Sequence, residues 1–558
     1  MFKENNQSEL FSFENQLLDN QHKELLEKTL EKAFYNLIFR NIKETDYKVL
    51  FSDNGSRPNT PINILVAALI LKERKSWSYD ELMESTMFDM RTKVAFGLSS
   101  IDYKPFSRAT IFNFQIRLAD YEKETGINLL KKTFDNLTAE QLKKIKIKTS
   151  IQRSDSTLIS SNIRKYSRIQ LLIEVLLRMF RIFDDTDKSS LSESIKPYSQ
   201  EGSNKYVYKL KSTDLPHELE KLGKLYLTVY KHVSIKYSDT DEYRVFERVF
   251  QEHFTIAEDI ISAKPSNELN SSMLQSPDDE DATYKKKQEQ ESKGYSINAT
   301  ETANPENPIQ LITDIDVNKN NIDDSKILEN RIDKIVEKTP ELNELHTDGG
   351  YGSVEVDKKM EQKGISLVTT AVRGRESEIE KTITQSIDNE QEYLVECPEQ
   401  SIISRPARKR NKAIFDTAKC INCPLKEKCD IAKNNGKYYF YHSDFLRNQR
   451  NKNIQKIPKE RRKIRPNVEA TMKEFKVKTK AGKIKVRGMF KASIFAFAMG
   501  ISINFGRIYR YLNENGLNFD IILTNFNKVI FKIIFLIFLV QNRFNKTEFI
   551  RNFSTIKF

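Results

Sequence analysis

The order of strand-like and helix-like segments across the middle of the chain constrains the fold more than any other feature. Residues 144–160 alternate apolar and polar side chains, which predicts a strand, and a long helical segment follows to about residue 262. The polar stretch 263–292 predicts an exposed loop. The pattern then predicts strands at 294–301 and 309–317, a helix at 323–339, and strands at 343–350 and 365–372. This order predicts an α/β core with a mixed sheet and a helical insert.

The first part of the chain predicts an all-α region. Residues 1–50 carry apolar side chains at helical spacing, and residues 62–74 are apolar on nearly every side, as in a buried helix. Thr60 followed by Pro61 predicts the start of this second helix, because threonine caps helices and proline is tolerated in the first turn.

A polar, basic helix is predicted over 106–124, with Ser107 as its cap and Arg108 and Arg117 among its side chains. A series of short helices whose last helix is basic resembles a helix-turn-helix DNA-binding motif. An ordinary helical bundle fits the same periodicity.

Positive charge is concentrated toward the C-terminal end. Residues 447–491 contain 17 Lys and Arg and three acidic residues, a net charge of +14, against +13 for the whole chain of 558 residues. Shorter basic segments lie at 144–148 and 405–412. This concentration favours a polyanionic partner, above all nucleic acid, with an anionic membrane surface as the rival.

The cysteine usage and the ends of the chain indicate the compartment. All four cysteines lie between residues 397 and 429, so disulfide bonds could not cross-link the rest of the chain. This pattern does not suit a secreted protein stabilised by disulfides. The N-terminal residues lack the apolar run of a signal peptide, and the most apolar stretch, 529–540, is shorter than a membrane span. We therefore expect a cytoplasmic, nucleoid-associated protein with no membrane partner.

Three acidic residues stand where a mixed sheet would carry function. Asp155 lies on the first predicted strand, Asp348 at the end of the fourth, and Glu469 on a helix near the C-terminal end. Asp, Asp and Glu are suitable ligands for two Mg²⁺ or Mn²⁺ ions, which together promote phosphodiester cleavage and transfer. The set is weak evidence alone, because the chain has 78 acidic residues.

The residues around these acids carry a family resemblance. RSDSTLISSNIRK at 153–165, HTDGGYG at 346–352 and RRKIRPNVEATMKEF at 461–475 resemble the Asp-Asp-Glu (DDE) transposases of bacterial insertion sequences, above all the IS-eleven-eighty-two family. Residues 57–98 resemble the InsH-like N-terminal domain of these proteins, and the likeness covers about residues 50–510. It implies an RNase H-like core in which Asp155, Asp348 and Glu469 are the catalytic, metal-binding triad.

The resemblance also suggests which basic residues bind DNA. Arg465, Glu469 and Lys476 match the arginine, glutamate and lysine of the Tyr-Arg-Glu-Lys signature of related families, but Arg462 stands at the tyrosine position. Gripping terminal phosphates is the expected role of Arg465 and Lys476. The other candidate DNA-binding residues are Arg461, Arg462, Arg487, Arg108 and Arg117.

Cys397, Cys420, Cys423 and Cys429 follow the spacing C-x22-C-x2-C-x5-C. The C-x2-C pair is typical of zinc ligands, while the rest of the spacing is irregular. A structural Zn²⁺ and unliganded reduced thiols both remain open. His346, two residues before Asp348, is expected on the same strand face as that aspartate, either near the site or as a hydrogen-bonded core residue.

The expected organisation is a helical segment (1–50), a helical DNA-binding domain (51–135), a catalytic domain (140–510) and a C-terminal tail (511–558) without an assigned role. The catalytic domain would hold a helical insert at about 160–290 and a cysteine-containing insert at about 373–460. The expected function is a DNA transposase that binds terminal inverted repeats and target DNA, cleaves strands and joins them, as a homodimer on DNA. The alternatives are an inactive or repurposed DNA-binding protein and a stand-alone metal-dependent nuclease.

Overall fold

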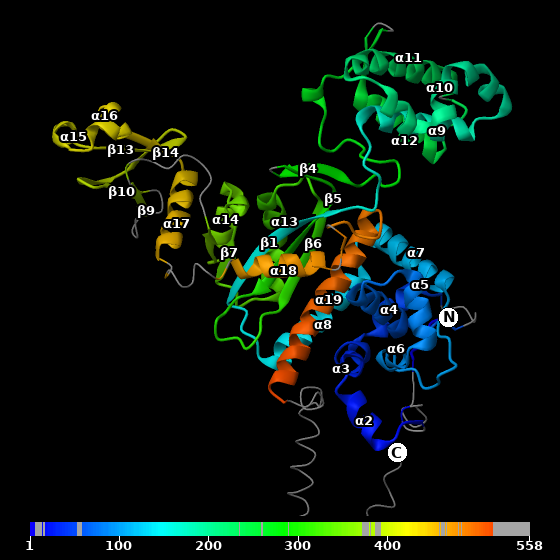
Figure 1. The fold of residues 1–558 in the computed structure, drawn as a ribbon. Helices are drawn as coiled ribbons and strands as arrows, with labels where there is room; N and C mark the ends of the chain where they lie inside the picture. The colour runs from blue at the N-terminus through cyan, green and yellow to red at the C-terminus, as the bar shows by residue number, and fades with distance from the viewer. Residues whose placement is uncertain are drawn as a thin grey trace, which may run out of the picture. The chain divides into compact units, whose positions relative to one another are not determined.

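The computed structural model describes residues 1–516 except 6–13, 15–16, 53–57, 234, 258–259, 288, 371–378, 380, 386–391, 457, 459–463, 465, 478 and 481. The chain divides into two compact units (Figure 1). One contains residues up to Lys72, residues Trp77–Ile147 and the chain from Ile501 onward. The other contains Glu73–Ser76 and Lys148–Gly500. The predicted apolar stretch 529–540 and most of the tail lie outside the described residues.

The first unit is helical, as the sequence predicts. Its helices are α2 (Asn20–Glu27), α3 (Leu30–Leu37), α4 (Ile62–Lys75), α5 (Tyr79–Phe88), α6 (Met90–Ala95), α7 (Arg108–Thr125) and α8 (Leu129–Ile145), with short 3-10 turns at Phe39–Asn41 and Glu44–Leu50. Ser107 caps α7 as predicted, since its side chain accepts a hydrogen bond from the amide of Thr110.

The start of α4 differs from the prediction based on Thr60 and Pro61. The helix begins at Ile62, and the carboxylate of Glu44 accepts hydrogen bonds from the amides of Ile62 at 3.0 Å and Asn63 at 3.4 Å. A side chain eighteen residues away therefore satisfies the unpaired donors of the first turn. Periodicity could not reveal this contact, because it depends on how the chain folds back.

The second unit is built on a six-stranded mixed sheet. Its strands are β1 (Ile151–Ser160), β4 (Thr283–Lys287), β5 (Gln290–Thr302), β6 (Ile312–Lys319), β7 (Glu344–Thr347) and β8 (Ser366–Thr369). Neighbouring strands follow the order β4-β5-β1-β7-β8, and β6 also pairs with β5. β5 is antiparallel to β1, β4 and β6, whereas β1, β7 and β8 are mutually parallel. The predicted α/β class with a helical N-terminal region is confirmed, and the strand order is consistent with an RNase H-like core.

The segment 263–292 is not the single exposed loop that its polarity predicts. It contains β4 and the start of β5, which form an antiparallel hairpin. β4 consists of Thr, Tyr and three lysines, so it has no apolar alternation. Pairing with β5 makes it a strand, and this pairing is invisible to a pattern based on hydrophobicity. The predicted strand at 144–160 is also shorter in the structure, because α8 extends to Ile145.

Two helices cover one face of this sheet. α13 (Asp324–Lys338) contacts β6, and α14 (Val354–Gln362) contacts β8 and α13. Leu345 of β7 and Leu367 of β8 pack with Ile332 and Met360 of these helices in a buried cluster. The predicted helix at 323–339 is therefore confirmed almost to the residue.

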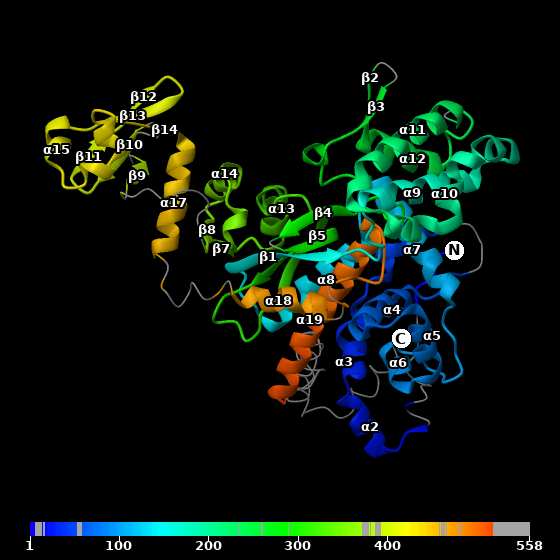
Figure 2. The same cartoon turned by 45° about the horizontal axis from the view of Figure 1, so that its top comes forward.

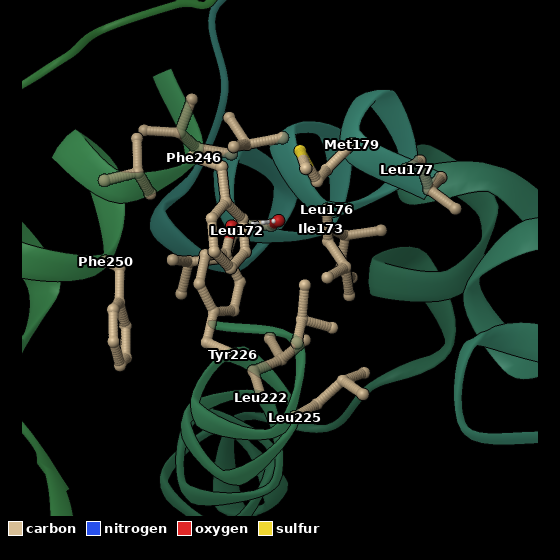
Figure 3. Packing of buried hydrophobic residues seen from close by; sticks show 14 of the residues in the cluster. Leu172, Ile173, Leu176, Leu177, Met179, Leu222, Leu225, Tyr226, Phe246 and Phe250 are labelled. Carbon is tan, nitrogen blue, oxygen red and sulfur yellow. Dashed lines mark hydrogen bonds between the residues drawn. The ribbon is translucent and has the colours of Figure 1, made fainter. Parts of the chain in front are cut away.

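A helical insert separates β1 from β4. It comprises α9 (Arg168–Ile182), α10 (Asp185–Lys209, kinked at Gly202), α11 (Leu215–Val233) and α12 (Asp241–His253), followed by the hairpin β2 (Phe254–Ala257) and β3 (Ile260–Ala263). Figure 3 shows its core, where Leu172 and Leu176 of α9 face Leu222 and Tyr226 of α11. The ring of Tyr226 stacks on Phe246 of α12 at a centroid separation of 4.7 Å. The insert has its own hydrophobic core, as the four amphipathic helices require.

A second insert follows β8. It contains the sheet β9 (Thr382–Gln385), β10 (Tyr393–Cys397) and β11 (Gln400–Ile403), and the sheet β12 (Arg405–Ala407), β13 (Arg410–Ile414) and β14 (Lys437–Phe440). The short helices α15 (Thr417–Asn422) and α16 (Asp430–Lys433) lie between β13 and β14. The chain returns through α17 (His442–Lys456), whose Arg450 donates to Asp357 of α14 at 3.0 Å.

The last two described helices are α18 (Pro466–Val477) and α19 (Met489–Glu514). α18 packs against β1 (Figure 2). α19 is the one helix in the described part of the chain long and apolar enough to cross a membrane, but 83% of its most apolar window is buried within the protein. Core helices of soluble proteins pass the same test, so α19 is weak evidence for a membrane span.

Candidate active site

Asp155 lies on β1, and Asp348 follows directly after the neighbouring parallel strand β7. The two strands pair from Ile151 opposite Glu344 to Arg153 opposite His346, and each aspartate lies two residues beyond this last pair. Parallel strands lie about 4.8 Å apart, and residues in register point to the same face. The sheet therefore brings these two acids together across 193 positions of sequence.

Each of the two carboxylates also accepts a backbone hydrogen bond. Asp155 is 7% exposed, and its Oδ1 accepts from the amide of Ser156 at 2.8 Å. Asp348 follows the last residue of β7, and its Oδ1 accepts from the amide of Gly350 at 2.6 Å. The glycines after Asp348 form a 3-10 turn, so Asp348 sits at a half-buried strand end, as the sequence predicts.

Glu469 comes to the same face of the sheet on α18. Val468, Thr471, Met472 and Phe475 form the buried side of this helix, and Glu469 is exposed in its first turn. The helix packs against β1, the strand that carries Asp155.

A buried polar network attaches α18 to the sheet. Thr471 donates to Glu301 Oε2 of β5 at 2.8 Å, and Arg153 of β1 donates to Glu301 Oε1 at 2.6 Å. Arg153 also donates to the carbonyl of Ile464, just before the helix, at 2.8 Å. Because Arg153 and Asp155 are two residues apart on one strand, they share the sheet face on which α18 lies.

Three carboxylates surround a buried tyrosine beside this site. The hydroxyl of Tyr351, which is 2% exposed, donates to Asn298 Oδ1 at 3.0 Å. Burial raises the pKa of Tyr351 well above its usual range, and the negative charges of Asp324, Asp155 and Asp348 raise this pKa further. Asp324 therefore lies near the two predicted catalytic aspartates.

Sequence reasoning missed Asp324. It stands in the first turn of α13 and hydrogen-bonds to the side chain of Ser156, the neighbour of Asp155. Burial raises its pKa, and the nearby Asp348 adds to the rise. Acidic residues are common in the first turn of any helix, so the sequence offers no signal that distinguishes this one.

His346 shares its strand face with Asp348, as alternation predicts. It is 2% exposed, and its Nε2 lies 2.6 Å from Glu344 Oε1. His346 is therefore a buried, hydrogen-bonded histidine, the second of the two predicted alternatives.

The predicted DNA-binding residues divide into three groups. Arg461, Arg462 and Arg465 lie outside the described residues. Lys476 is exposed, seven residues after Glu469 on α18. Arg487, Arg108 and Arg117 contact other residues of the protein.

Arg487 donates to the carbonyl of Asn162 at 2.7 Å and lies 3.4 Å from Asp278. In the helical unit, Arg108 lies 2.6 Å from Asp80, and the guanidinium of Arg117 lies over the ring of Phe51 at 5.1 Å. Lys476 therefore shares a helix with Glu469, whereas Arg487, Arg108 and Arg117 contact neighbouring parts of their own units.

The four cysteines gather in the second insert. Burial raises the pKa of the Cys420 thiol, and Cys429, Cys397 and Cys423 lie close enough to raise it further. The sulfur of Cys423 accepts from the amide of Leu425 at 3.4 Å. All four thiols are free and partly buried.

Among the described residues, neither the predicted acidic ligands nor the cysteines form a complete metal-binding site. Among the residues that the structure describes, no group of three or more His, Cys, Asp or Glu side chains is placed closely enough to hold a metal ion. The donor chemistry nevertheless suits metals: carboxylate oxygens suit Mg²⁺ or Mn²⁺, and thiolates suit Zn²⁺.

Comparison with known proteins gives one finding. Residues 396–509 match the family model described as a transposase DDE domain. The match covers the cysteine-containing insert from Glu396 onward, α17, α18 with Glu469, and most of α19, but neither Asp155 nor Asp348. No curated protein and no solved structure matches the chain. The match supports a DDE transposase.

Proposed function

We propose that the chain is the DNA transposase of an insertion sequence, which cleaves DNA strands and joins them to a target. The pairing of β1 with β7, just before Asp155 and Asp348 in each segment, carries this proposal. Both acids come from segments outside the matched region, and the helix that bears Glu469 packs against β1. The strand order is consistent with an RNase H-like core, and the motifs around the three acids resemble the IS-eleven-eighty-two family.

Asp155, Asp348 and Glu469 would hold the divalent cations, and Asp324 lies beside them. Divalent metals activate water or a 3′ hydroxyl for in-line attack on phosphorus and stabilise the departing oxygen. The pairing of β1 with β7 supports a common position for the two aspartates, and the network of Arg153, Glu301 and Thr471 attaches the helix of Glu469 to the sheet face of Asp155. Lys476 is positioned to bind a phosphate near that helix.

The helical unit and the basic segment 447–491 are proposed to bind the terminal inverted repeats of the insertion sequence. Joining two cut ends to one target requires two active sites, so the working form is proposed to be a homodimer on DNA. Both assignments follow from the family resemblance and the charge distribution.

The four cysteines are proposed to bind one structural Zn²⁺. Cys397, Cys423 and Cys429 lie near enough to Cys420 to influence the pKa of its thiol. Cys397, Cys420 and Cys429 also pack against the hydrophobic cluster of this insert. A bound ion would cross-link β10, α15 and the segment before α16.

The test uses a plasmid that carries the gene with its native flanks. Purified protein is incubated with Mg²⁺ or Mn²⁺, and new 3′ ends are mapped for the wild type, Asp348→Asn and the control His217→Gln, which changes an exposed residue of the helical insert. Breaks at paired flanking repeats, lost in Asp348→Asn by a factor of about 10³ or more, are expected; loss of a metal-positioned nucleophile has this order of effect. A second readout is the binding of Mn²⁺ by the protein alone, which Asp348→Asn should weaken.

Tight DNA binding without breaks in either metal would favour a repurposed DNA-binding protein. Breaks at random positions, without joining, would favour a stand-alone nuclease. Breaks that persist in Asp348→Asn would mean that the active site lies elsewhere.

A further inference from the structure

The sheet formed by β12, β13 and β14 has one buried face and one exposed face. Ala413 of β13 and Phe440 of β14 are 0% and 1% exposed and belong to the hydrophobic cluster of the cysteine insert, against which Tyr438 packs. Because side chains alternate along a strand, the residues between these positions point to the opposite face. Figure 2 shows the three strands side by side in the insert. The opposite face is therefore a surface of the insert and not part of its core.

This exposed face carries basic and aromatic side chains in one array. Arg405 of β12 stands opposite Lys412 of β13, and Lys412 stands opposite Tyr439 of β14. The three strands contain no Asp or Glu, and all of their basic residues lie on this face. Alternation along the chain adds four residues to the same face, which are Arg410, Ile414, Lys437 and Tyr441.

Two tyrosines on this face are exposed and are contacted by cations. Tyr439 and Tyr441 are 45% and 49% exposed. The guanidinium of Arg410 lies 5.4 Å from the ring centroid of Tyr439 and 5.8 Å from that of Tyr441. The ammonium of Lys412 lies 5.7 Å from the ring centroid of Tyr439. These cation–π contacts order the rings while they leave much of the ring surface in water.

The positive charges of this face have no acidic partner among the described residues. None of the four basic side chains forms an ion pair there, whereas Lys381 of the same insert pairs with Asp430. Solvent-exposed faces usually mix both signs of charge and expose few large apolar side chains. Here the cations surround two tyrosines and Ile414, which is 57% exposed.

Exposed rings among cations suit a single-stranded nucleic acid, because unpaired bases stack on the rings and phosphates bind the cations. A duplex would satisfy only the charges, since its bases already stack on one another. The combination of tyrosines with unpaired cations on one sheet face therefore favours a single strand as the partner.

We propose that this face binds single-stranded DNA, with unpaired bases stacked on Tyr439 and Tyr441 and backbone phosphates bound by the four basic side chains. This inference rests on the proposed function, whose substrates are cleaved DNA strands, and adds to it a site for unpaired nucleotides in the cysteine insert. Stacking accepts any base, so the site carries no strong sequence preference.

The stacking contacts are tested with Tyr439→Ala, Tyr441→Ala and Tyr439→Phe in the full-length chain. Tyr208→Ala, which removes a 92% exposed tyrosine from the helical insert, is the control. Binding of an oligo-dT strand and of a dA·dT duplex of the same length is measured without divalent metal, so that no cleavage occurs. Each lost stacking contact should weaken oligo-dT binding by about fivefold or more. Tyr439→Phe keeps the ring and should bind oligo-dT like the wild type, and duplex binding by the tyrosine variants should be unchanged.

The phosphate contacts are tested with Lys412→Gln and the matched control Lys433→Gln. Both substitutions remove one positive charge from the insert, but Lys433 belongs to α16 and not to the sheet. Loss of one phosphate contact should lower the slope of log K against log salt by about 0.7 for a single strand. This reduction is expected for Lys412→Gln and not for Lys433→Gln.

Oligo-dT binding by Tyr439→Ala and Tyr441→Ala that equals binding by Tyr208→Ala would overturn the proposal. Equal losses for oligo-dT and the duplex would also overturn it, because they would indicate contacts with the backbone alone or general damage to the insert. These outcomes are distinct from failure of the proposed function, in which the wild type makes no metal-dependent breaks or Asp348→Asn remains active.

Discussion

The attachment of α18 to the sheet can be tested through Arg153. Its guanidinium is 8% exposed and pairs with Glu301, whose side chain is fully buried. Arg153→Met keeps an apolar stem of similar length but removes the ion pair with Glu301 and the hydrogen bond to the carbonyl of Ile464. Removing one partner of a buried ion pair costs about 3–5 kcal/mol, because the remaining charge is left desolvated.

This cost should appear as local opening of α18. Arg153 also holds the carbonyl of Ile464, at the entry to the helix, so both anchors are lost together. Hydrogen exchange of the α18 amides reports this opening, and a loss of about 3 kcal/mol makes exchange about a hundredfold faster. The rate of cleavage in the plasmid assay should fall as well, because Glu469 is part of α18 and its position changes when the helix opens.

Arg331→Met is the matched control. Arg331 is buried like Arg153, but it pairs with Asp314 on the opposite face of the sheet, so its loss should speed exchange in α13 and not in α18. The double variant Arg153→Met/Glu301→Gln should lose less stability than the two single variants together, since no lone charge remains. Unchanged exchange in α18 after Arg153→Met would refute the reasoning and would mean that apolar packing alone holds the helix.

Two further predictions concern the inserts. In the helical insert, His253 is 5% exposed, and burial with the nearby positive charges of Arg168 and Lys264 lowers its pKa to about 4. Its neutral form is favoured in the folded state, so this stability is present above the unfolded pKa of about 6.5 and about 3 kcal/mol of it is lost as the pH falls to about 4. Thermal unfolding between pH 7 and pH 4 should therefore depend less on pH in His253→Gln than in the wild type or His217→Gln, and identical profiles would contradict the burial argument. In the cysteine insert, the purified chain should contain about one Zn²⁺ by metal analysis, and Cys423→Ser should lose it; a zinc-free wild type purified without chelator would favour reduced thiols.

Local patterns predicted the helices and the central strands well. The helices at 62–74 and 323–339 and the cap at Ser107 follow from side chains that are near one another in sequence. The strands predicted at 294–301 and 343–350 correspond to β5 and β7, although β5 begins at Gln290 and β7 covers only Glu344–Thr347. These features depend on neighbours within about one or two turns, so a single sequence contains the necessary information.

Local patterns failed where a distant partner decides the outcome. β4 is a strand because β5 pairs with it, and the first turn of α4 is capped by Glu44 from another segment. Asp324 was missed for the same reason, since an acid at a helix start becomes part of a site only when the sheet brings Ser156 and Asp348 beside it.

The sequence by itself determined the α/β class, the identity of the three candidate acids, the clustered cysteines and the concentration of positive charge, because each depends on composition, spacing or a recognisable motif. Only the tertiary structure decided which of these groups meet. The pairing of β1 with β7 brings the segments of Asp155 and Asp348 together, and hydrogen bonds from Thr471 and Arg153 attach α18 to the sheet. Hydrogen bonding between strands and burial of charge act between residues more than a hundred positions apart, so the pattern along the chain does not record them.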